Sequence, residues 1–283
     1  MDWTQRLNKA VDYIENHLME DPDPEELARI AGCSFYHFQR VFLYLADMTL
    51  TEYIRRRKMS RAAVDLQGGD EKIIDVALKY GYSSPTAFNR AFQSVHGVAP
   101  SALRRDGITV KSTSPLVFKI SITGVEEMNY RIETKEAFHV IGVSCPLEKE
   151  VEKNFENIPR KWQEAKTDGT MEKLCTLMNS SPKGVLGVSN CGNSGEPWKY
   201  YIAVASSAVD EALEEYEVPA ATWAIFPGEG PGPSIQELEV RIVREWLPSS
   251  GYEYASGPDI EVYLDDDPEC MHFEVWIPVT KKQ

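Results

Sequence analysis

The sequence predicts a multidomain protein in which an all-α N-terminal domain with two helix-turn-helix units precedes an α+β C-terminal domain. Residues 88–92 (FNRAF) repeat the pattern of residues 38–42 (FQRVF), which indicates a duplicated helical unit. Beyond residue 128, segments typical of strands and helices follow the order β-α-β-β twice, which predicts two repeats and an antiparallel sheet. A chain of 283 residues is long enough for two domains.

Each copy of the helical repeat has the residues that end one helix and begin the next. Gly32 and Gly81 each follow a helical apolar pattern, and glycine ends helices because it adopts positive φ without a Cβ penalty. Ser34 and Ser84 follow within three residues and are good N-caps, and Pro85 suits a first helical turn. Each copy therefore predicts a helix, a turn that contains glycine, and a second helix, which is a helix-turn-helix signature.

The second helix of each copy has one apolar and one polar face. Apolar residues recur at positions i, i+3, i+4 and i+7 in residues 34–45 and again in residues 84–95. A single copy would fit an ordinary amphipathic helix equally well, but two copies with matching caps favour DNA binding. Side chains off the apolar face can read base edges, since arginine pairs with guanine and glutamine or asparagine with adenine. The predicted DNA contacts are Tyr36, Gln39, Arg40, Thr86, Asn89 and Arg90.

The segment between the two copies predicts a long helix with a basic cluster. Residues 50–66 combine an apolar helix face with four consecutive basic residues at 55–58 and a fifth, Arg61. A charge cluster is usually a solvated face, but beside two reading helices we expect part of it to contact DNA phosphates. Residues 96–105 predict a turn and a short closing helix.

Residues 1–106 resemble the DNA-binding domain of the AraC/XylS family of transcription regulators. The motifs that carry the resemblance are ELARIAGCS…FQRVF, YIRRRKM, DVALKYGYSS…FNRAF and GVAPSALR. The resemblance implies seven helices, with two helix-turn-helix units joined by a long central helix and bound to successive major-groove segments. It implies that the polar side chains of the first copy contact one segment and those of the second copy contact the next.

The formal net charge of −14 is unusual for a protein that binds DNA. The charge is unevenly distributed. Residues 1–106 contain 14 Lys and Arg against 15 Asp and Glu, and the remaining residues contain 16 against 29. The acidity therefore belongs to the second part of the chain, which we do not expect to bind nucleic acid. For the near-neutral first part we expect modest nonspecific affinity and a marked dependence on salt.

Cysteines, histidines and apolar runs indicate a reduced cytoplasmic setting. The five cysteines are scattered without a Cys-x-x-Cys pair, and the five histidines lack metal spacing, so we expect no disulfide framework, metal or cofactor. No apolar run is long enough to span a membrane, and residues 1–18 form an amphipathic pattern instead of a signal peptide.

Residues 107–128 predict a partly ordered linker, and residues 129–280 predict the second domain. The predicted elements, in chain order, are strand 138–146, helix 151–165, strands 184–190 and 198–206, strand 222–230, helix 234–247 and a hairpin within 259–279. Two such units predict a pseudo-twofold domain with the sheet in one layer and helices in the other. A groove between the two units is a natural ligand site.

The predicted hairpin places a carboxylate beside an aromatic residue on one face of each strand. Glu261 and Tyr263 share a face of the first strand, and Glu274 and Trp276 share a face of the second. This pairing suits a cation with apolar bulk, because a ring face adds a cation–π contribution of roughly 0.5–2 kcal/mol. From the spacing alone, a solvated sheet face with scattered aromatic residues stays open as an alternative.

Residues 129–280 resemble the GyrI-like effector-binding domain, which occurs fused to DNA-binding domains in several regulator families. The carrying motifs are YEVPAATWAIF, PDIEVYL and FEVWIPV. In that family a glutamate on the strand that matches DIEVYL meets cationic, lipophilic ligands, which implies this role for Glu261. The resemblance also implies a pocket position for Trp223, with Glu274 and Trp276 as neighbours. If Glu261 is buried without a partner, its pKa should be raised, and a bound cation should restore the charged form.

Together these features predict a sequence-specific transcription regulator and not an enzyme. The expected partners are double-stranded promoter DNA and a small cationic, lipophilic effector, with RNA polymerase as a further candidate. Two alternatives stay open. The second domain could hydrolyse small molecules with Glu261 and Glu274 as an acid/base pair, although no His, Ser or Cys lies in an evident nucleophile setting. It could also sequester a basic partner protein.

Overall fold

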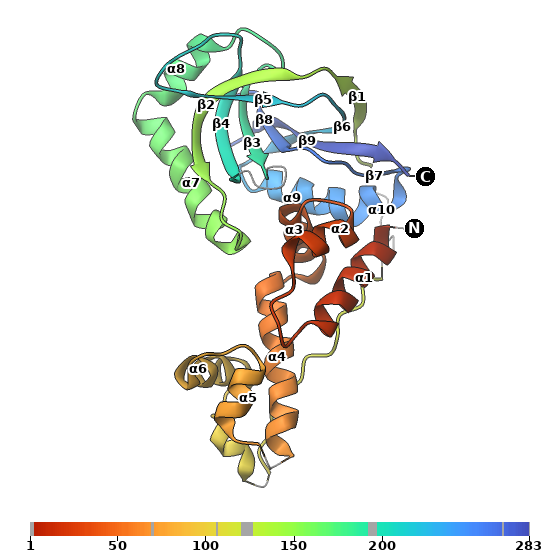
Figure 1. Ribbon diagram of the computed structural model, residues 1–283. Coiled ribbons are helices and arrows are strands. Elements are labelled where there is room, and N and C mark those ends of the chain that lie inside the picture. The colour runs from red at the N-terminus through yellow and green to blue at the C-terminus, as the bar shows by residue number, and fades with distance from the viewer. Residues whose placement is uncertain are drawn as a thin grey trace. The chain divides into compact units, whose positions relative to one another are not determined.

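The computed structural model describes residues 3–68, 71–105, 107–119, 127–191, 197–267 and 269–282 (Figure 1). Its contacts divide the chain into two compact units. The first unit comprises residues 1–31 and 46–119, and the second comprises residues 32–45 and 120–283. The second helix of the first repeat copy, α3 (Phe35–Ala46), therefore groups with the C-terminal half of the chain. The domain limits at residues 106 and 128 stay predictions.

Helices form the first unit, as the repeat predicts. Its elements are α1 (Trp3–Asn16), α2 (Pro24–Ala31), α4 (Leu50–Gln67), α5 (Ile73–Lys79), α6 (Pro85–His96) and the 3₁₀ helix η1 (Pro100–Arg104). The predicted caps are present. Gly81 has φ +83° after α5, and the Ser84 hydroxyl accepts from the backbone N–H of Ala87 at the start of α6. No helix of the described part of the chain is long and apolar enough to cross a membrane.

Part of the basic cluster on α4 is structural. Arg57 is buried, and its guanidinium forms an ion pair with Glu15 of α1 at 2.6 Å. The segment after η1 runs along the same two helices. The backbone N–H of Leu116 donates to the Tyr53 hydroxyl at 3.0 Å, and the backbone N–H of Phe118 donates to an α1 side-chain amide at 2.8 Å. Residues 107–119 of the predicted linker therefore pack on α1 and α4, and residues 120–126 lie outside the described residues.

The second unit has the predicted α+β fold. Besides α3, its elements are β1 (Arg131–Lys135), β2 (Phe138–Pro146), α7 (Val151–Thr167), α8 (Thr170–Leu177), β3 (Val185–Asn190), β4 (Lys199–Ala205), β5 (Glu214–Val218), β6 (Ala221–Gly230), α9 (Ser234–Arg241), the π-helical turn η2 (Ile242–Trp246), α10 (Leu247–Ser249), β7 (Tyr252–Tyr254), β8 (Asp259–Tyr263) and β9 (Met271–Lys281). The two predicted repeats are β2-α7-β3-β4 and β6-α9-β8-β9. Strands β1, β5 and β7 and helix α8 were not predicted.

The sheet is antiparallel and pseudo-symmetric. Its strand order within the described residues is β1-β6-β9-β8-β3-β4-β2-β5, with β7 paired to β9. The two repeats meet where β8 pairs with β3. From this junction the order is β8-β9-β6 toward one edge and β3-β4-β2 toward the other, so equivalent strands follow in the same order. The edge strands are exchanged, since β1 precedes the first repeat but pairs with β6 of the second, and β5 precedes the second repeat but pairs with β2 of the first.

The two faces of the sheet differ in what covers them. One face carries a core built from strand residues, including Val140, Leu186 and Ile260, so the curved sheet packs against itself there. The other face packs against α7 and α8 (Figure 1). Tyr36 of α3 packs in the same cluster. Strand β8 alternates between them as the hairpin pattern predicts, and Glu261 points to the helical face. The candidate site therefore lies on the helical face.

Candidate functional site

A groove with a volume of about 1120 Å³ opens on the helical face of the second unit. Helices α7 and α8 line one side, α9 lines the other, and residues of β4 and β8 line its floor. Aromatic side chains contribute much of the lining, and the floor carries a carboxylate. The aromatic residues of the lining are Tyr36, Tyr44, Phe155, Trp162, Tyr200 and Tyr263.

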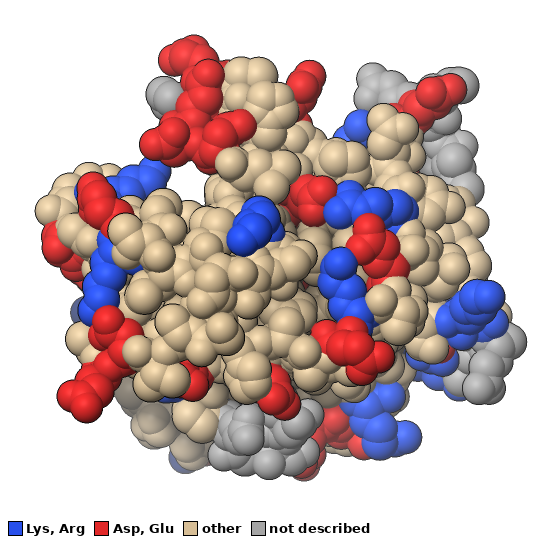
Figure 2. All heavy atoms as spheres, turned by 90° about the horizontal axis from the view of Figure 1, so that it is seen from above, with Lys and Arg blue, Asp and Glu red and all other residues tan. Residues whose placement is uncertain are grey.

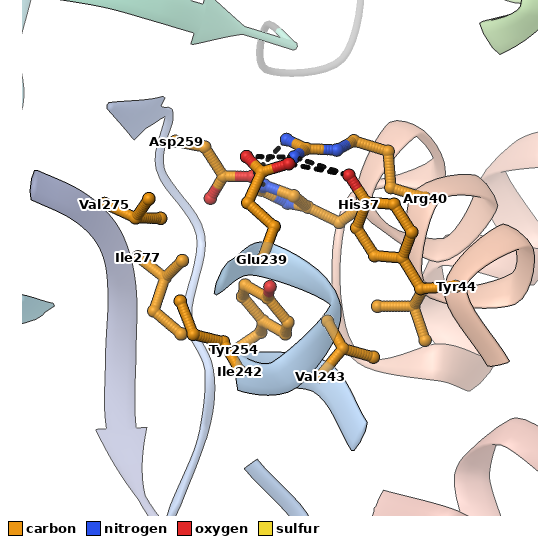
Figure 3. Close-up of a pocket in the computed structure, with 11 residues that line it drawn as sticks. His37, Arg40, Tyr44, Glu239, Ile242, Val243, Tyr254, Asp259, Val275 and Ile277 are labelled. Carbon is orange, nitrogen blue, oxygen red and sulfur yellow. Dashed lines mark hydrogen bonds and ion pairs between the residues drawn. The ribbon is translucent and has the colours of Figure 1, made fainter. Parts of the chain in front are cut away.

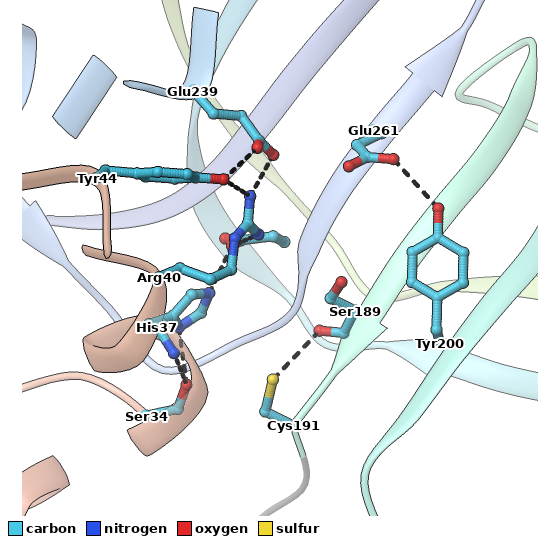
Figure 4. Close-up of polar contacts among 10 residues, drawn as sticks. Ser34, His37, Arg40, Tyr44, Ser189, Cys191, Tyr200, Glu239 and Glu261 are labelled. Carbon is cyan, nitrogen blue, oxygen red and sulfur yellow. Dashed lines mark hydrogen bonds and ion pairs between the residues drawn. The ribbon is translucent and has the colours of Figure 1, made fainter. Parts of the chain in front are cut away.

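The floor carboxylate is that of Glu261, at the junction of the two repeats. Its Oε2 accepts a hydrogen bond from the Tyr200 hydroxyl at 3.1 Å (Figure 4). It accepts another from the Tyr263 hydroxyl at 2.7 Å. The Tyr200 hydroxyl is oriented in turn by the Trp162 indole N–H, which donates to it at 3.0 Å. The Trp162 ring also meets the Tyr263 ring edge-on, with 4.8 Å between ring centroids. The carboxylate is thus held by neutral donors in an aromatic setting.

The environment raises the pKa of Glu261 to about 7. The main cause is burial, and the nearby charge of Glu239 adds to it, while the two tyrosine hydroxyls and Arg40 oppose the shift. Burial also raises the pKa of Tyr200, so its hydroxyl stays protonated and can donate. Near neutral pH the Glu261 carboxyl therefore exchanges readily between its neutral and charged forms, and a bound cation would favour the charged form.

A second group of charges joins α3 to α9 and β8. The Arg40 guanidinium forms an ion pair with Glu239 of α9, and its Nη1 donates to Oδ2 of Asp259 on β8 at 3.0 Å (Figure 3). The Tyr44 hydroxyl accepts from Arg40 at 3.1 Å and donates to Glu239 at 2.7 Å. We call Arg40, Tyr44, Glu239 and Asp259 the Arg40 cluster. Its two carboxylates and its guanidinium are largely buried.

His37 extends the contact between α3 and β8. Its Nε2 lies 2.7 Å from Oδ2 of Asp259, its Nδ1 lies 2.9 Å from the Ser34 hydroxyl, and its ring stacks on Tyr254. Burial by itself would raise the pKa of Asp259, but the adjacent His37 and Arg40 lower the pKa below its ordinary value. Asp259 is therefore charged at neutral pH. It binds α3 through the side chains of His37 and Arg40.

The two predicted reading helices differ in exposure. On α3, Tyr36 and Gln39 are only 4% and 6% exposed, and Arg40 belongs to the cluster described above. On α6, Thr86 and Arg90 are exposed and Asn89 is half-buried. The role of all six residues in DNA contact stays a prediction, and the structure leaves the second set accessible.

The five predicted effector residues do not form one cluster. Glu261 and Tyr263 lie in the groove, but Trp223, Glu274 and Trp276 belong to the opposite side of the sheet. There Trp223 packs 5.9 Å from Trp276, whose indole N–H donates to Glu274 at 2.8 Å. Glu274 also pairs with an arginine of β1 at 2.8 Å. Glu261 and Glu274 consequently point away from each other and do not form the acid/base pair of the enzyme alternative.

Sequence reasoning did not identify Trp162, Tyr200 and Glu239 as groove residues. Trp162 and Tyr200 lie on correctly predicted elements, α7 and β4, but the sequence does not show that they meet at the groove. Glu239 resembles any other helical carboxylate in the sequence. Among the residues that the structure describes, no group of three or more His, Cys, Asp or Glu side chains could hold a metal ion.

Family comparisons agree with both halves of the fold. Residues 27–106 match a helix-turn-helix domain, and residues 131–279 match the integron-associated effector binding protein family. The protein is therefore a DNA-binding transcription regulator with an effector-binding domain. Over more than half of its length the chain belongs to the integron-associated effector binding protein family, with a GyrI-like fold, and its helix-turn-helix region is of the AraC type.

Individual proteins are similar to part or to all of the chain. The HTH-type transcriptional regulator YbfP of Bacillus subtilis is 30% identical over 158 residues, 56% of this chain, which span about half (49%) of YbfP. The right origin-binding protein of Escherichia coli K12 is 24% identical in an alignment that covers 99% of this chain and 100% of that protein. A solved structure of SAV2435 bound to tetraphenylphosphonium is 19% identical, covers 54% of this chain and 94% of that chain, and has a TM-score of 0.47.

Proposed function

We propose that the groove binds a small lipophilic cation over Glu261 and that this binding controls sequence-specific promoter recognition by the helix-turn-helix units. The observation that carries the proposal is the buried carboxyl group of Glu261, which lies at the floor of an aromatic groove and has its pKa raised to about 7. The proposed setting is the cytoplasm, where the promoter DNA lies. RNA polymerase is the third proposed partner, because a regulator bound at a promoter lies close to the site where the polymerase binds.

The surroundings of Glu261 favour a cation over a neutral or anionic ligand. Among the described side chains, its hydrogen-bond donors are two tyrosines, and neither supplies a positive charge. A cation would compensate the buried charge, and aromatic faces would add a cation–π contribution of roughly 0.5–2 kcal/mol. The groove is also large enough for a ligand with several rings.

The exposed side chains of α6 support DNA recognition by the second unit of the repeat. Thr86 and Arg90 are exposed at the beginning and in the middle of a capped helix, where side chains of a reading helix meet base edges. The sequestering alternative is less well supported. Figure 2 shows acidic and basic side chains interspersed over one face of the molecule, whereas capture of a basic protein favours a continuous acidic surface.

Calorimetric titration of the full chain with tetraphenylphosphonium tests the proposal. We expect Glu261→Gln to weaken binding by about tenfold or more, since the loss of a buried opposite charge costs at least 1.4 kcal/mol. The matched control is Glu172→Gln, which removes a carboxylate at the exposed rim of the same groove and should leave binding nearly unchanged. Equal binding by Glu261→Gln, or equally tight binding of the neutral triphenylphosphine oxide, would contradict the proposal.

A further inference from the structure

A predicted base-reading arginine lies inside the effector-binding unit. The side chain of Arg40 is 13% exposed and that of its partner Glu239 is 8% exposed. The corresponding arginine of the second repeat, Arg90, is exposed on α6. The two repeat copies are therefore alike in sequence but not in accessibility, and the difference arises from contacts that α3 makes with β8 and α9.

The Arg40 cluster borders the groove that contains Glu261. Arg40, Tyr44 and Glu239 line the same cavity as Glu261 (Figure 4). Their charges also act on the Glu261 carboxyl: the charge of Glu239 raises its pKa, and the charge of Arg40 lowers it. A cation bound at Glu261 would thus lie near a guanidinium that it repels and near a carboxylate that it attracts.

We propose that Arg40 acts as an internal cation of the effector groove. A cationic effector displaces Arg40 from Glu239 and Asp259, and this displacement releases α3 to contact DNA. This inference rests on the proposed function. A buried guanidinium that loses one carboxylate to a competing cation is left undercompensated, and breaking such a pair is strongly unfavourable. Release into solvent, and then pairing with DNA, relieves that cost.

Further contacts hold α3 against the effector-binding unit in one defined arrangement. Tyr36 packs in the apolar cluster beneath α7 and α8, with its ring 6.1 Å from the Trp198 ring. The backbone carbonyl of Tyr44 accepts from the Arg244 guanidinium at 2.6 Å. In this state the polar side chains of α3 are unavailable to a duplex. DNA and the cation then favour the same released state, so each should raise the affinity for the other by the same factor.

Fluorescence anisotropy with the full chain tests this coupling. The duplex is one selected from a random-sequence library by the full chain in the presence of tetraphenylphosphonium. We expect tetraphenylphosphonium to tighten binding by the wild type by about 5- to 150-fold, the usual range of allosteric coupling. Glu239→Gln should bind tightly without the cation and respond little to it. Glu237→Gln, two residues earlier on the exposed side of α9, should behave as the wild type.

A second variant and a second measurement test the same mechanism even if the Glu239→Gln variant fails to fold. Tyr44→Phe removes the hydroxyl that joins Arg40 to Glu239 and should shift DNA affinity in the same direction. Hydrogen exchange of residues 35–46 in the wild type should increase when tetraphenylphosphonium binds. Binding of the cation through Glu261 without a change in DNA affinity or in this exchange would overturn the Arg40 mechanism and leave the proposed function intact. Absence of cation binding would overturn the proposed function instead, and equal DNA affinities of Glu239→Gln, Glu237→Gln and wild type would overturn the role of the Arg40 cluster.

Discussion

Gly187 on β3 pairs directly with Glu261 on β8, and the missing side chain of Gly187 gives the Glu261 carboxylate room to meet the Tyr200 hydroxyl. A Cβ atom at position 187 would lie 2.2 Å from that hydroxyl and 2.8 Å from the carboxylate oxygen. The floor of the groove therefore depends on a glycine that is required for its lack of volume and not for its backbone conformation.

Gly187→Ala should separate Glu261 from Tyr200. We expect the free energy of unfolding to fall by about 1–3 kcal/mol, as for other overpacked sites, and tetraphenylphosphonium binding to weaken. Urea denaturation and calorimetric titration measure the two effects. Gly232→Ala is the matched control, because Gly232 also lines the groove but has no atoms within 4 Å of an added Cβ. Similar behaviour of the two variants would show that the glycine at 187 is not required.

Cation binding should depend on pH through Glu261. Because a cation favours the charged carboxyl and the pKa of Glu261 is about 7, affinity should be highest above pH 7 and decrease as the pH falls. Well below the pKa the charged fraction, and with it the affinity, should fall about tenfold for each pH unit. Titrations with tetraphenylphosphonium between pH 5 and pH 8 measure this slope. The same slope in Glu261→Gln would assign the pH dependence to another group.

Glu261→Gln should stabilise the protein at alkaline pH. The folded-state pKa of about 7 lies above the ordinary value of 4.5, so the folded state binds the proton more tightly. The contribution of Glu261 to stability is then fully present below pH 4.5 and is lost as the pH rises through 7. Relative to wild type, Glu261→Gln should gain about 1–3 kcal/mol in unfolding free energy at pH 8 and little at pH 5. Urea denaturation at both pH values checks this, and an equal difference at both would refute it.

The two reading arginines should differ in their response to the effector. Arg90→Ala should weaken DNA binding by about 1–3 kcal/mol with or without tetraphenylphosphonium, because Arg90 is exposed and lies outside the Arg40 cluster. Arg40→Ala should weaken it by a similar amount mainly in the presence of the cation. Anisotropy titrations of both variants with the selected duplex provide the comparison. Equal losses for Arg40→Ala in both conditions would argue against a buried Arg40 in the unliganded protein.

Local sequence signals predicted the parts of the fold that local physics determines. The glycine and serine caps around α6 act within a few residues, so Gly81 and Ser84 were readable as the end of one helix and the start of another. The alternation in β8 likewise placed Glu261 and Tyr263 on one face. Strands β1 and β5 were missed because they are short edge strands with many charged residues, RIETK and EEYEV.

Long-range pairing determined what the sequence could not predict. Alternation within β9 shows that Glu274 and Trp276 share a face, but only the pairing of Trp276 with Ile260 of β8 shows that this face is opposite to that of Glu261. The burial of Arg40 has the same origin. The sequence pattern places the Arg40 side chain on a solvated helix face, and its partner Asp259 lies 219 residues further along the chain.

The exchanged edge strands make the two β-α-β-β repeats interdependent. Each repeat has its outermost ladder of hydrogen bonds completed by the strand that precedes the other repeat. A fragment that ends after β4 would leave β1 without its partner and expose the β3 side of the junction as an open edge, and such edges promote aggregation. The two repeats can therefore differ in side chains, as the groove requires, but neither can complete its part of the sheet without the other.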